Sequence, residues 1–157
     1  MLGTIEIGLL YKSHSAYHEA VLEAARAAVD AGVSVDADVQ ALAAFQHVLS
    51  VEDVGQIATV TIFDATNTGQ AVASANTQTT YVYSPTAKLF VCQVTLAVPP
   101  CDPAAQSVWD AASRTSTVSS HLYLGVSVSF THKTLTGVFS PITLKEYASL
   151  LIEPTSY

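Results

Sequence analysis

The segment Ala20-Val-Leu-Glu-Ala-Ala-Arg-Ala-Ala-Val29 decides the fold class of this chain. Its residues are strong helix formers, and no proline occurs between Thr4 and Ala31. The sequence therefore predicts one long helix over residues 4–31, with Gly32 as its C-terminal cap. At about 1.5 Å per residue, a helix of this length would measure about 42 Å.

A stripe of small side chains runs along the predicted helix. Its members recur every three or four residues, and they are Ala16, Ala20, Ala24, Ala27 and Ala31. Residues at this spacing share one face of a helix, and small side chains let another backbone approach closely. We therefore expect the stripe to be a contact face.

The hydrophobic period changes after this helix. Residues 39–49 keep helical spacing, and Asp36 or Asp38 can cap a second, short helix that ends near Ser50. Residues 58–63 then alternate as in a strand, and the turn residues 64–69 follow. Further strands are predicted at 81–83, 89–94, 122–131 and 142–152, with 98–120 mostly loop. The stretch 145–150, taken alone, is also compatible with a helix.

Helices first and strands afterwards predict an α+β fold, in which the long helix lies across one face of an antiparallel sheet of about four strands. The 157 residues suit a single domain, 1–157, composed of a helical part at 1–32 and a globular part at 33–157. Thirteen acidic residues face six basic ones, and the formal charge is -7. With no basic cluster, the chain is not expected to bind nucleic acid.

Cys92 and Cys101 are the only cysteines of the chain. The segment between them contains Pro99-Pro100, a stiff turn that can return the second thiol to the first. A local disulfide would stabilise the fold by about 2–3 kcal/mol and would place the chain outside the reducing cytosol. Two free, buried thiols are the alternative.

Two histidines offer the only metal-like spacing. His14 and His18 lie four residues apart on the predicted helix, so both imidazoles can reach one ion. A third ligand would have to come from His47, His121 or His132. The alternative is that both are solvated histidines of the helix surface, and no metal or cofactor is expected.

Aromatic residues suggest a second kind of site. Trp109, the only tryptophan, lies near Asp110 and Arg114, and this guanidinium can stack on the indole or pair with the carboxylate. The cluster is either an anchor of the loop or part of a ligand site. A secreted or surface binding module would need a concave aromatic pocket around Tyr81, Tyr83 or Trp109.

Catalytic motifs are not found in the sequence. It contains no Gly-x-Ser-x-Gly elbow and no glycine-rich phosphate-binding loop. An enzyme of another type would need titratable groups that converge in one cleft. We therefore expect a protein that is not an enzyme.

Short motifs near both ends resemble the TadE-like family, minor pseudopilins of the Tad (tight adherence) pilus-assembly system. They are Gly3-Thr-Ile-Glu-Ile-Gly8, Ala24-Ala-Arg-Ala-Ala28, Tyr123-Leu-Gly-Val126, Thr131-His-Lys-Thr134, Leu135-Thr-Gly137, Ile142-Thr-Leu144 and Ile152-Glu-Pro154. In that family a membrane-spanning apolar segment continues into an alanine-rich helix. Residues 3–8 match the outer end of this segment, and Glu6 matches its acidic residue.

The resemblance implies a non-catalytic subunit with a pilin-like fold. It implies a cell-membrane anchor, of which most is expected to be missing here because the apolar start is shorter than the roughly 20 residues that cross a bilayer. The globular part would then be extracellular or periplasmic. Its partners would be other pilin or pseudopilin subunits and the pilus-assembly machinery, and the alanine stripe would be the assembly face.

Overall fold

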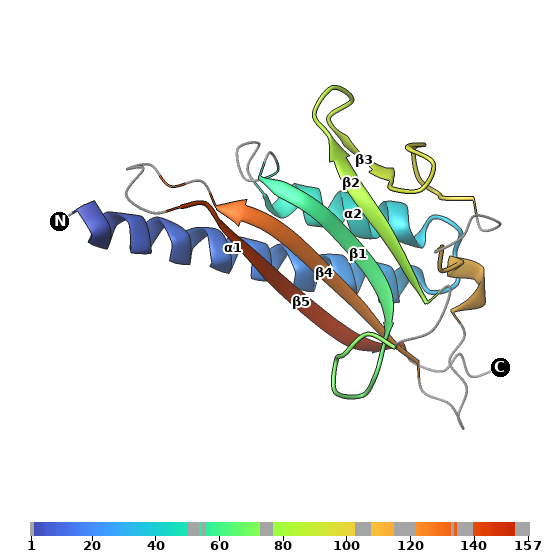
Figure 1. The fold of residues 1–157 in the computed structure, drawn as a ribbon. Coiled ribbons are helices and arrows are strands. Elements are labelled where there is room, and N and C mark those ends of the chain that lie inside the picture. Colours follow the sequence, from blue (N-terminus) through green and yellow to red (C-terminus); the bar gives the residue numbers. More distant parts are fainter. Residues whose placement is uncertain are drawn as a thin grey trace.

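The computed structural model describes residues 2–49, 54, 56–72, 77–102, 108–114, 122–132, 134 and 140–152. Within these residues, two helices precede a five-stranded antiparallel sheet (Figure 1). The predicted α+β class is confirmed, and the sheet has one strand more than expected. His121, residues 135–137, residues 153–154, and the parts of the expected loop at 103–107 and 115–120 lie outside the described residues.

The first helix, α1, spans Leu2–Ala31, as the sequence predicts. It ends at Gly32, whose φ of 59° is in the left-handed region that glycine adopts without strain. The amide of Gly32 donates to the carbonyls of Ala28 and Val29, at 3.2 and 3.0 Å. The predicted glycine cap is therefore confirmed.

The second helix, α2, spans Ala37–Val48. Asp36 occupies the N-cap position, but its side chain makes no cap hydrogen bond. Its backbone amide instead donates to the hydroxyl of Ser34, at 3.3 Å. The predicted carboxylate cap is thus wrong. The Asp36 carboxylate accepts no amide of the first turn, and the Asp38 carboxylate accepts hydrogen bonds from Tyr81 and Arg114 instead.

The sheet has the strand order β3-β2-β1-β4-β5. Its strands are β1 (Ile57–Ala65), β2 (Gln78–Ser84), β3 (Leu89–Cys92), β4 (Leu122–His132) and β5 (Ile142–Ile152). β5 pairs with β4 along its whole length, from Leu122 opposite Ile152 to His132 opposite Ile142. The strand interpretation of residues 145–150 is therefore confirmed, and the helix alternative is wrong.

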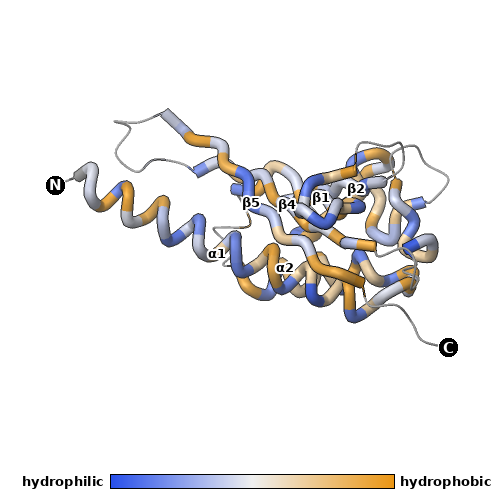
Figure 2. The backbone as a smooth tube through the Cα atoms, turned by 90° about the horizontal axis from the view of Figure 1, so that it is seen from below, coloured by the Kyte–Doolittle hydropathy of each residue, from blue (hydrophilic) through white to orange (hydrophobic). Residues whose placement is uncertain are grey.

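Both helices cover the same face of the sheet (Figure 1). Alternate residues of the central strands, such as Val60, Val126 and Phe130, point to the helices and are fully or almost fully buried. Tyr17 of α1 stacks on Phe130, with ring centroids 3.7 Å apart. Neither of the two described α-helices lies on the other face of the sheet. The N-terminal turns of α1 extend beyond the end of the sheet (Figures 1 and 2).

Candidate functional site

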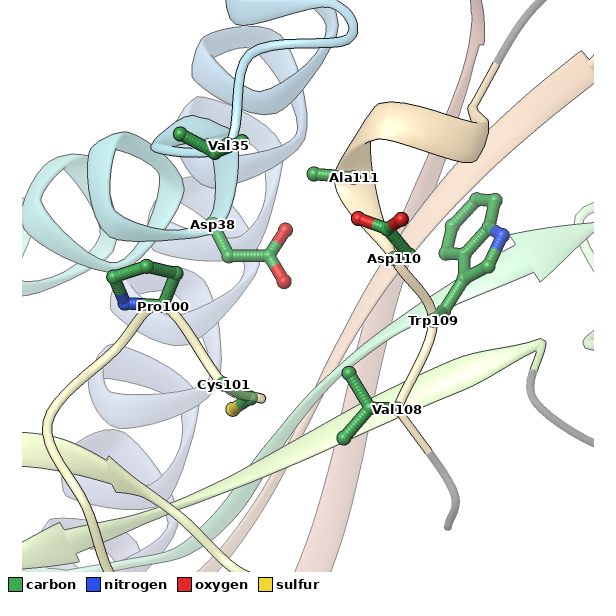
Figure 3. Close-up of a pocket in the computed structure, with 8 residues that line it drawn as sticks. All are labelled: Val35, Asp38, Pro100, Cys101, Val108, Trp109, Asp110 and Ala111. Atoms are coloured by element: carbon green, nitrogen blue, oxygen red, sulfur yellow. The ribbon is translucent and has the colours of Figure 1, made fainter. Parts of the chain in front are cut away.

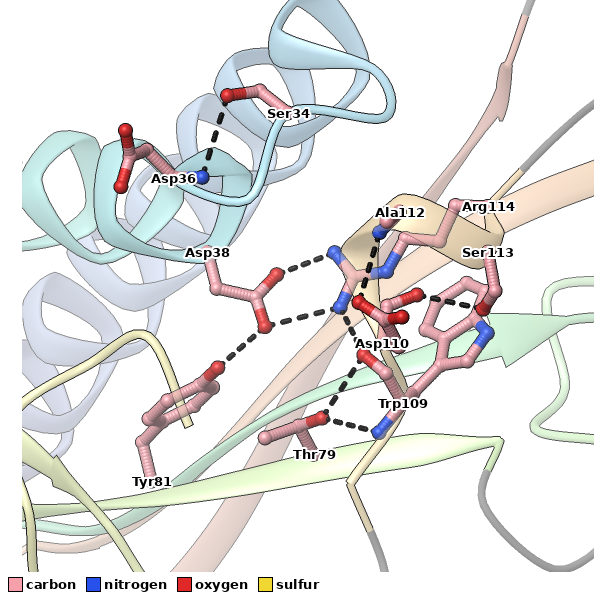
Figure 4. A network of polar contacts seen from close by, with 10 residues as sticks. All are labelled: Ser34, Asp36, Asp38, Thr79, Tyr81, Trp109, Asp110, Ala112, Ser113 and Arg114. Carbon is pink, nitrogen blue, oxygen red and sulfur yellow. Dashed lines mark hydrogen bonds and ion pairs between the residues drawn. The ribbon is translucent and has the colours of Figure 1, made fainter. Parts of the chain in front are cut away.

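A buried ion pair joins two distant segments of the chain (Figure 4). Arg114 follows the short 3-10 helix Ala111–Ser113, and its side chain is fully buried against Asp38 in the first turn of α2. Both terminal guanidinium nitrogens donate to the carboxylate, Nη1 to Oδ1 and Nη2 to Oδ2, the latter at 3.0 Å. This bidentate geometry is the strongest form of such a pair.

Trp109 supports the same guanidinium. The Arg114 Cζ atom lies 4.4 Å from the centroid of the indole, so the predicted stacking is confirmed. Arg114 Nη2 also donates to the Trp109 carbonyl at 2.8 Å, and the Trp109 amide donates to the Thr79 hydroxyl at 2.7 Å. The other predicted partner, Asp110, instead accepts from the Ala112 amide at 3.0 Å and caps the 3-10 helix.

Tyr81 of β2 closes the cluster, because its hydroxyl donates to Oδ2 of Asp38. Burial, followed by the negative charge of Asp38, raises the pKa of Tyr81 far above its usual value of 10.0. The phenol therefore keeps its proton. We call the set Asp38, Thr79, Tyr81, Trp109 and Arg114 the Arg114 clamp. It fixes the start of α2 to β2 and to the 3-10 segment.

A pocket of about 150 Å³ lies beside the clamp (Figure 3). Pro100 and Cys101 form part of its lining, together with Val35 and Asp38. Cys101 is bonded to Cys92, with a Cα–Cα distance of 5.8 Å, so the predicted disulfide is confirmed and the free-thiol alternative is wrong. The pocket is smaller than the roughly 300–1,000 Å³ of typical small-molecule sites. The Asp38 carboxylate beside it already has two partners.

Tyr81, Tyr83 and Trp109 do not form the concave aromatic pocket that a binding module would need. Tyr81 and Trp109 are buried in the Arg114 clamp. Tyr83 packs edge-on against Phe90, with ring centroids 5.5 Å apart. These rings are therefore used inside the fold.

The two helix histidines meet a carboxylate that the sequence did not indicate. Glu146 of β5 lies between them, with its Oε1 2.6 Å from His14 Nε2 and its Oε2 3.4 Å from His18 Nδ1. The predicted third partners His47 and His132 are not in this contact. Among the described residues, no group of three or more His, Cys, Asp or Glu side chains is arranged to hold a metal ion. The contact instead links α1 to β5.

The alanine stripe is divided between the interior and the surface. Ala20 and Ala24 are buried in the core of the chain, so close approach at these positions is used within the fold itself. Ala16, Ala27 and Ala31 are partly exposed. A role in contacts between subunits stays a prediction for these three.

The projecting end of α1, residues 3–11, combines exposed apolar groups with a buried polar one. Ile5, Ile7 and Tyr11 are 59%, 67% and 74% exposed. Glu6, in contrast, is buried, and its Oε1 lies 3.8 Å from Nε2 of His132 beside a small apolar cavity of about 180 Å³. Among the described residues, neither ring nitrogen of His132 has a hydrogen-bond partner.

The chain matches no family model, no curated protein and no solved structure. In the part of the chain that the structure describes, neither helix is long and apolar enough to cross a membrane. Function must therefore be inferred from the residues of the chain itself.

Proposed function

We propose that the chain is a non-catalytic subunit of a Tad-type (type IVc) pilus or a related secretion system, a minor pilin or pseudopilin. The observation that carries this proposal is the division of α1. Its later part, around Tyr17, Ala20 and Ala24, is buried on the sheet, whereas residues 3–11, at and beyond the end of the sheet, expose large apolar side chains to solvent.

The exposed apolar residues do not share one narrow stripe. Ile7 and Tyr11 are four residues apart and lie on the same side of α1, whereas Ile5 is two residues from Ile7 and points to another side. A helix that is apolar on several sides is normally surrounded by other apolar matter. The projecting end is thus suited to contact with the helices of other pilin or pseudopilin subunits and with a membrane reached through an upstream segment.

Two further features fit an assembly component outside the cytosol. The Cys92–Cys101 disulfide is typical of oxidising compartments. The Arg114 clamp uses its charged side chains to join parts of the fold to each other. This arrangement supports a rigid globular part that is held by its helix and presented outside the membrane.

The proposal can be tested by photocrosslinking in cells that produce the full gene product and the products of neighbouring genes. A photoreactive phenylalanine analogue replaces Ile7, and a matched variant carries it at Leu96, which is 70% exposed in the loop after β3. We expect Ile7 to crosslink to pilin-like subunits or assembly proteins, identified by mass spectrometry. Crosslinks to such proteins at neither position, or equally at both, would contradict an assembly role of the helix end.

A further inference from the structure

The face of the sheet opposite the helices contains a groove of about 560 Å³. The central strands β1 and β4 contribute Thr61 and Ser127, and the edge strand β5 contributes Lys145 and Tyr147. Gln78 of β2 also lines the groove, as does Gln70 of the loop between β1 and β2. The volume lies within the range of roughly 300–1,000 Å³ that is typical of small-molecule sites.

The loop between β1 and β2 builds one wall of the groove by close approach. At its tip, Gly69 has a φ of 80°, and a Cβ atom there would lie 2.9 Å from Ser149 Oγ and 3.5 Å from the Tyr147 ring. A side chain at this position would therefore push the loop away from β5. The glycine allows the loop to touch β5, and this contact encloses the groove on one side.

Phe63 of β1 also lines the groove, as does Ala71 of the loop between β1 and β2. The Phe63 ring lies directly on Gly125 of β4, where a Cβ atom would come within 2.4 Å of the ring. Phe63 is only 5% exposed, so its ring lies flat against the sheet and does not project into solvent. The floor of the groove thus combines this ring with the small hydroxyl side chains of Thr61 and Ser127.

Hydroxyl groups dominate this face of the sheet. The strand register places small hydroxyl side chains there at positions that include Thr59, Thr61, Thr80, Ser127, Ser129, Thr131, Thr143 and Ser149. Some bond across strands, such as Thr61 to Thr80 at 3.1 Å. A hydroxyl has one donor and two acceptor sites, so it can bind a further hydroxyl even when it is paired. Gln70 and Gln78 add amides that both donate and accept.

The charge of this face differs from that of the chain as a whole. The chain has thirteen acidic residues, yet no carboxylate side chain of the described residues points to this face. Glu146 turns to the opposite face, where it meets His14 and His18. Lys145 and Glu146 both belong to the groove lining, but the strand register directs only the Lys145 side chain to this face. Lys145 is exposed, so its ammonium stays solvated without a ligand partner. A neutral, hydroxyl-rich ligand can therefore use the hydroxyl and amide groups of the lining without burying a charge of its own.

Tyr147 adds a flat apolar surface at the edge of the groove. Its side chain is 57% exposed on the solvent side of β5. An aromatic ring beside hydroxyl and amide groups can stack on the C–H face of a pyranose while those groups bind its hydroxyls. From this combination we propose that the groove binds a neutral oligosaccharide. The proposal does not depend on the assembly role of the helix, which lies on the other side of the sheet.

The test is an NMR titration of the ¹⁵N-labelled full chain with three neutral probes, cellohexaose, maltohexaose and N-acetylchitohexaose. We expect at least one probe to shift the amides of residues 61, 78, 127 and 145–147 in a saturable manner. Tyr147→Ala should weaken this binding about tenfold or more, which corresponds to a loss of about 1.4 kcal/mol. Tyr11→Ala, which removes a tyrosine that is 74% exposed on α1, should leave it unchanged.

Gln78→Ala is a second variant, which removes an exposed amide of the groove and should weaken binding about threefold. The absence of saturable shifts with all three probes at millimolar concentration would overturn the proposal. So would equal effects of Tyr147→Ala and Tyr11→Ala, or shifts with a sulfated hexasaccharide alone. Shifts of the same amides on concentrating the protein without sugar would mean that a second copy covers the face, which would also overturn it.

Discussion

The Arg114 clamp and the projecting end of α1 each contain an acidic residue of a helix and a basic residue from later in the chain. In the clamp, Arg114 holds Asp38 with two hydrogen bonds and stacks on Trp109. At the projecting end, Oε1 of Glu6 and Nε2 of His132 are 3.8 Å apart, and neither imidazole nitrogen has a hydrogen-bond partner in the part of the chain that the structure describes. The clamp pairs the Asp38 carboxylate with both terminal nitrogens of Arg114, although Arg114 Nε has no hydrogen-bond partner among the described residues. The contacts proposed for the helix end would instead come from outside the chain.

The largest expected effect comes from breaking the clamp. Asp38→Ala leaves the Arg114 charge buried without its partner, and it should lower the free energy of unfolding by about 3–5 kcal/mol in urea denaturation. Asp36→Ala is the matched control, because the Asp36 side chain makes no cap bond. It should change stability by about 0.5 kcal/mol or less. Similar losses in both variants would show that the clamp contributes little.

The disulfide beside the clamp should have the next largest effect. Replacing both cysteines, Cys92→Ser with Cys101→Ser, should lower the free energy of unfolding by about 2–3 kcal/mol, because the unfolded chain gains the freedom of the opened loop. Reduction of the unmodified protein should give the same loss, measured by thermal denaturation. Reduction of the double variant should change nothing, and a further loss there would point to another cause.

High pH sharpens the comparison further. The pKa of Tyr81 is raised in the folded state, so its contribution is fully present below pH 10.0 and is lost as the pH rises above that value. The unfolded phenol then releases its proton and the folded one does not. The loss can reach about 1.4 kcal/mol per pH unit. Tyr81→Phe should show a shallower decline in denaturation series above pH 10.0, and identical slopes would count against the buried hydrogen bond to Asp38.

The smallest effect is expected midway along α1. Glu146→Gln weakens the contact with His14 and His18, but both imidazoles are about half exposed, at 48% and 58%. Such surface pairs contribute about 0–1 kcal/mol, and salt screens them. The change in urea midpoint should therefore be small and should shrink further at high salt. A loss as large as that of Asp38→Ala would mean that this contact, too, behaves as a buried one.

Local patterns predicted most of the fold. The helix formers and Gly32 determined the extent of α1, and the period-two alternation located β4 and β5. A sheet of about four strands was expected and five are present, although strands were predicted in all five places, β2 and β3 among them as short ones. The stacking of Arg114 on Trp109 was predictable because these residues are near each other in sequence.

The partners missed by sequence reasoning lie far away in the chain. Asp38 and Arg114 are separated by 76 positions, and the separation of His18 and Glu146 is 128. Asp38 was interpreted as a helix cap because short carboxylates commonly serve that role, and only the tertiary fold shows that Arg114 uses it instead. Glu146 shares the helix-facing side of β5 with Leu144 and Ala148, but its position opposite α1 depends on the sheet register. The groove around Tyr147 depends on the same register.

The order of the elements has a consequence for how this protein is made. β5, the last strand described, packs against α1, the first helix, and thereby helps to enclose buried positions such as Ala20 and Ala24. During synthesis, this side of α1 stays uncovered until β5 has been made and has paired with β4. Non-local pairing of this kind is slow and exposes chains to aggregation. A nascent chain that pauses before Ile142 therefore presents the side of α1 that β5 will later cover. A fragment that ends before Ile142 exposes the same side of α1. We therefore expect chaperones to bind this protein on α1 before the sheet is complete.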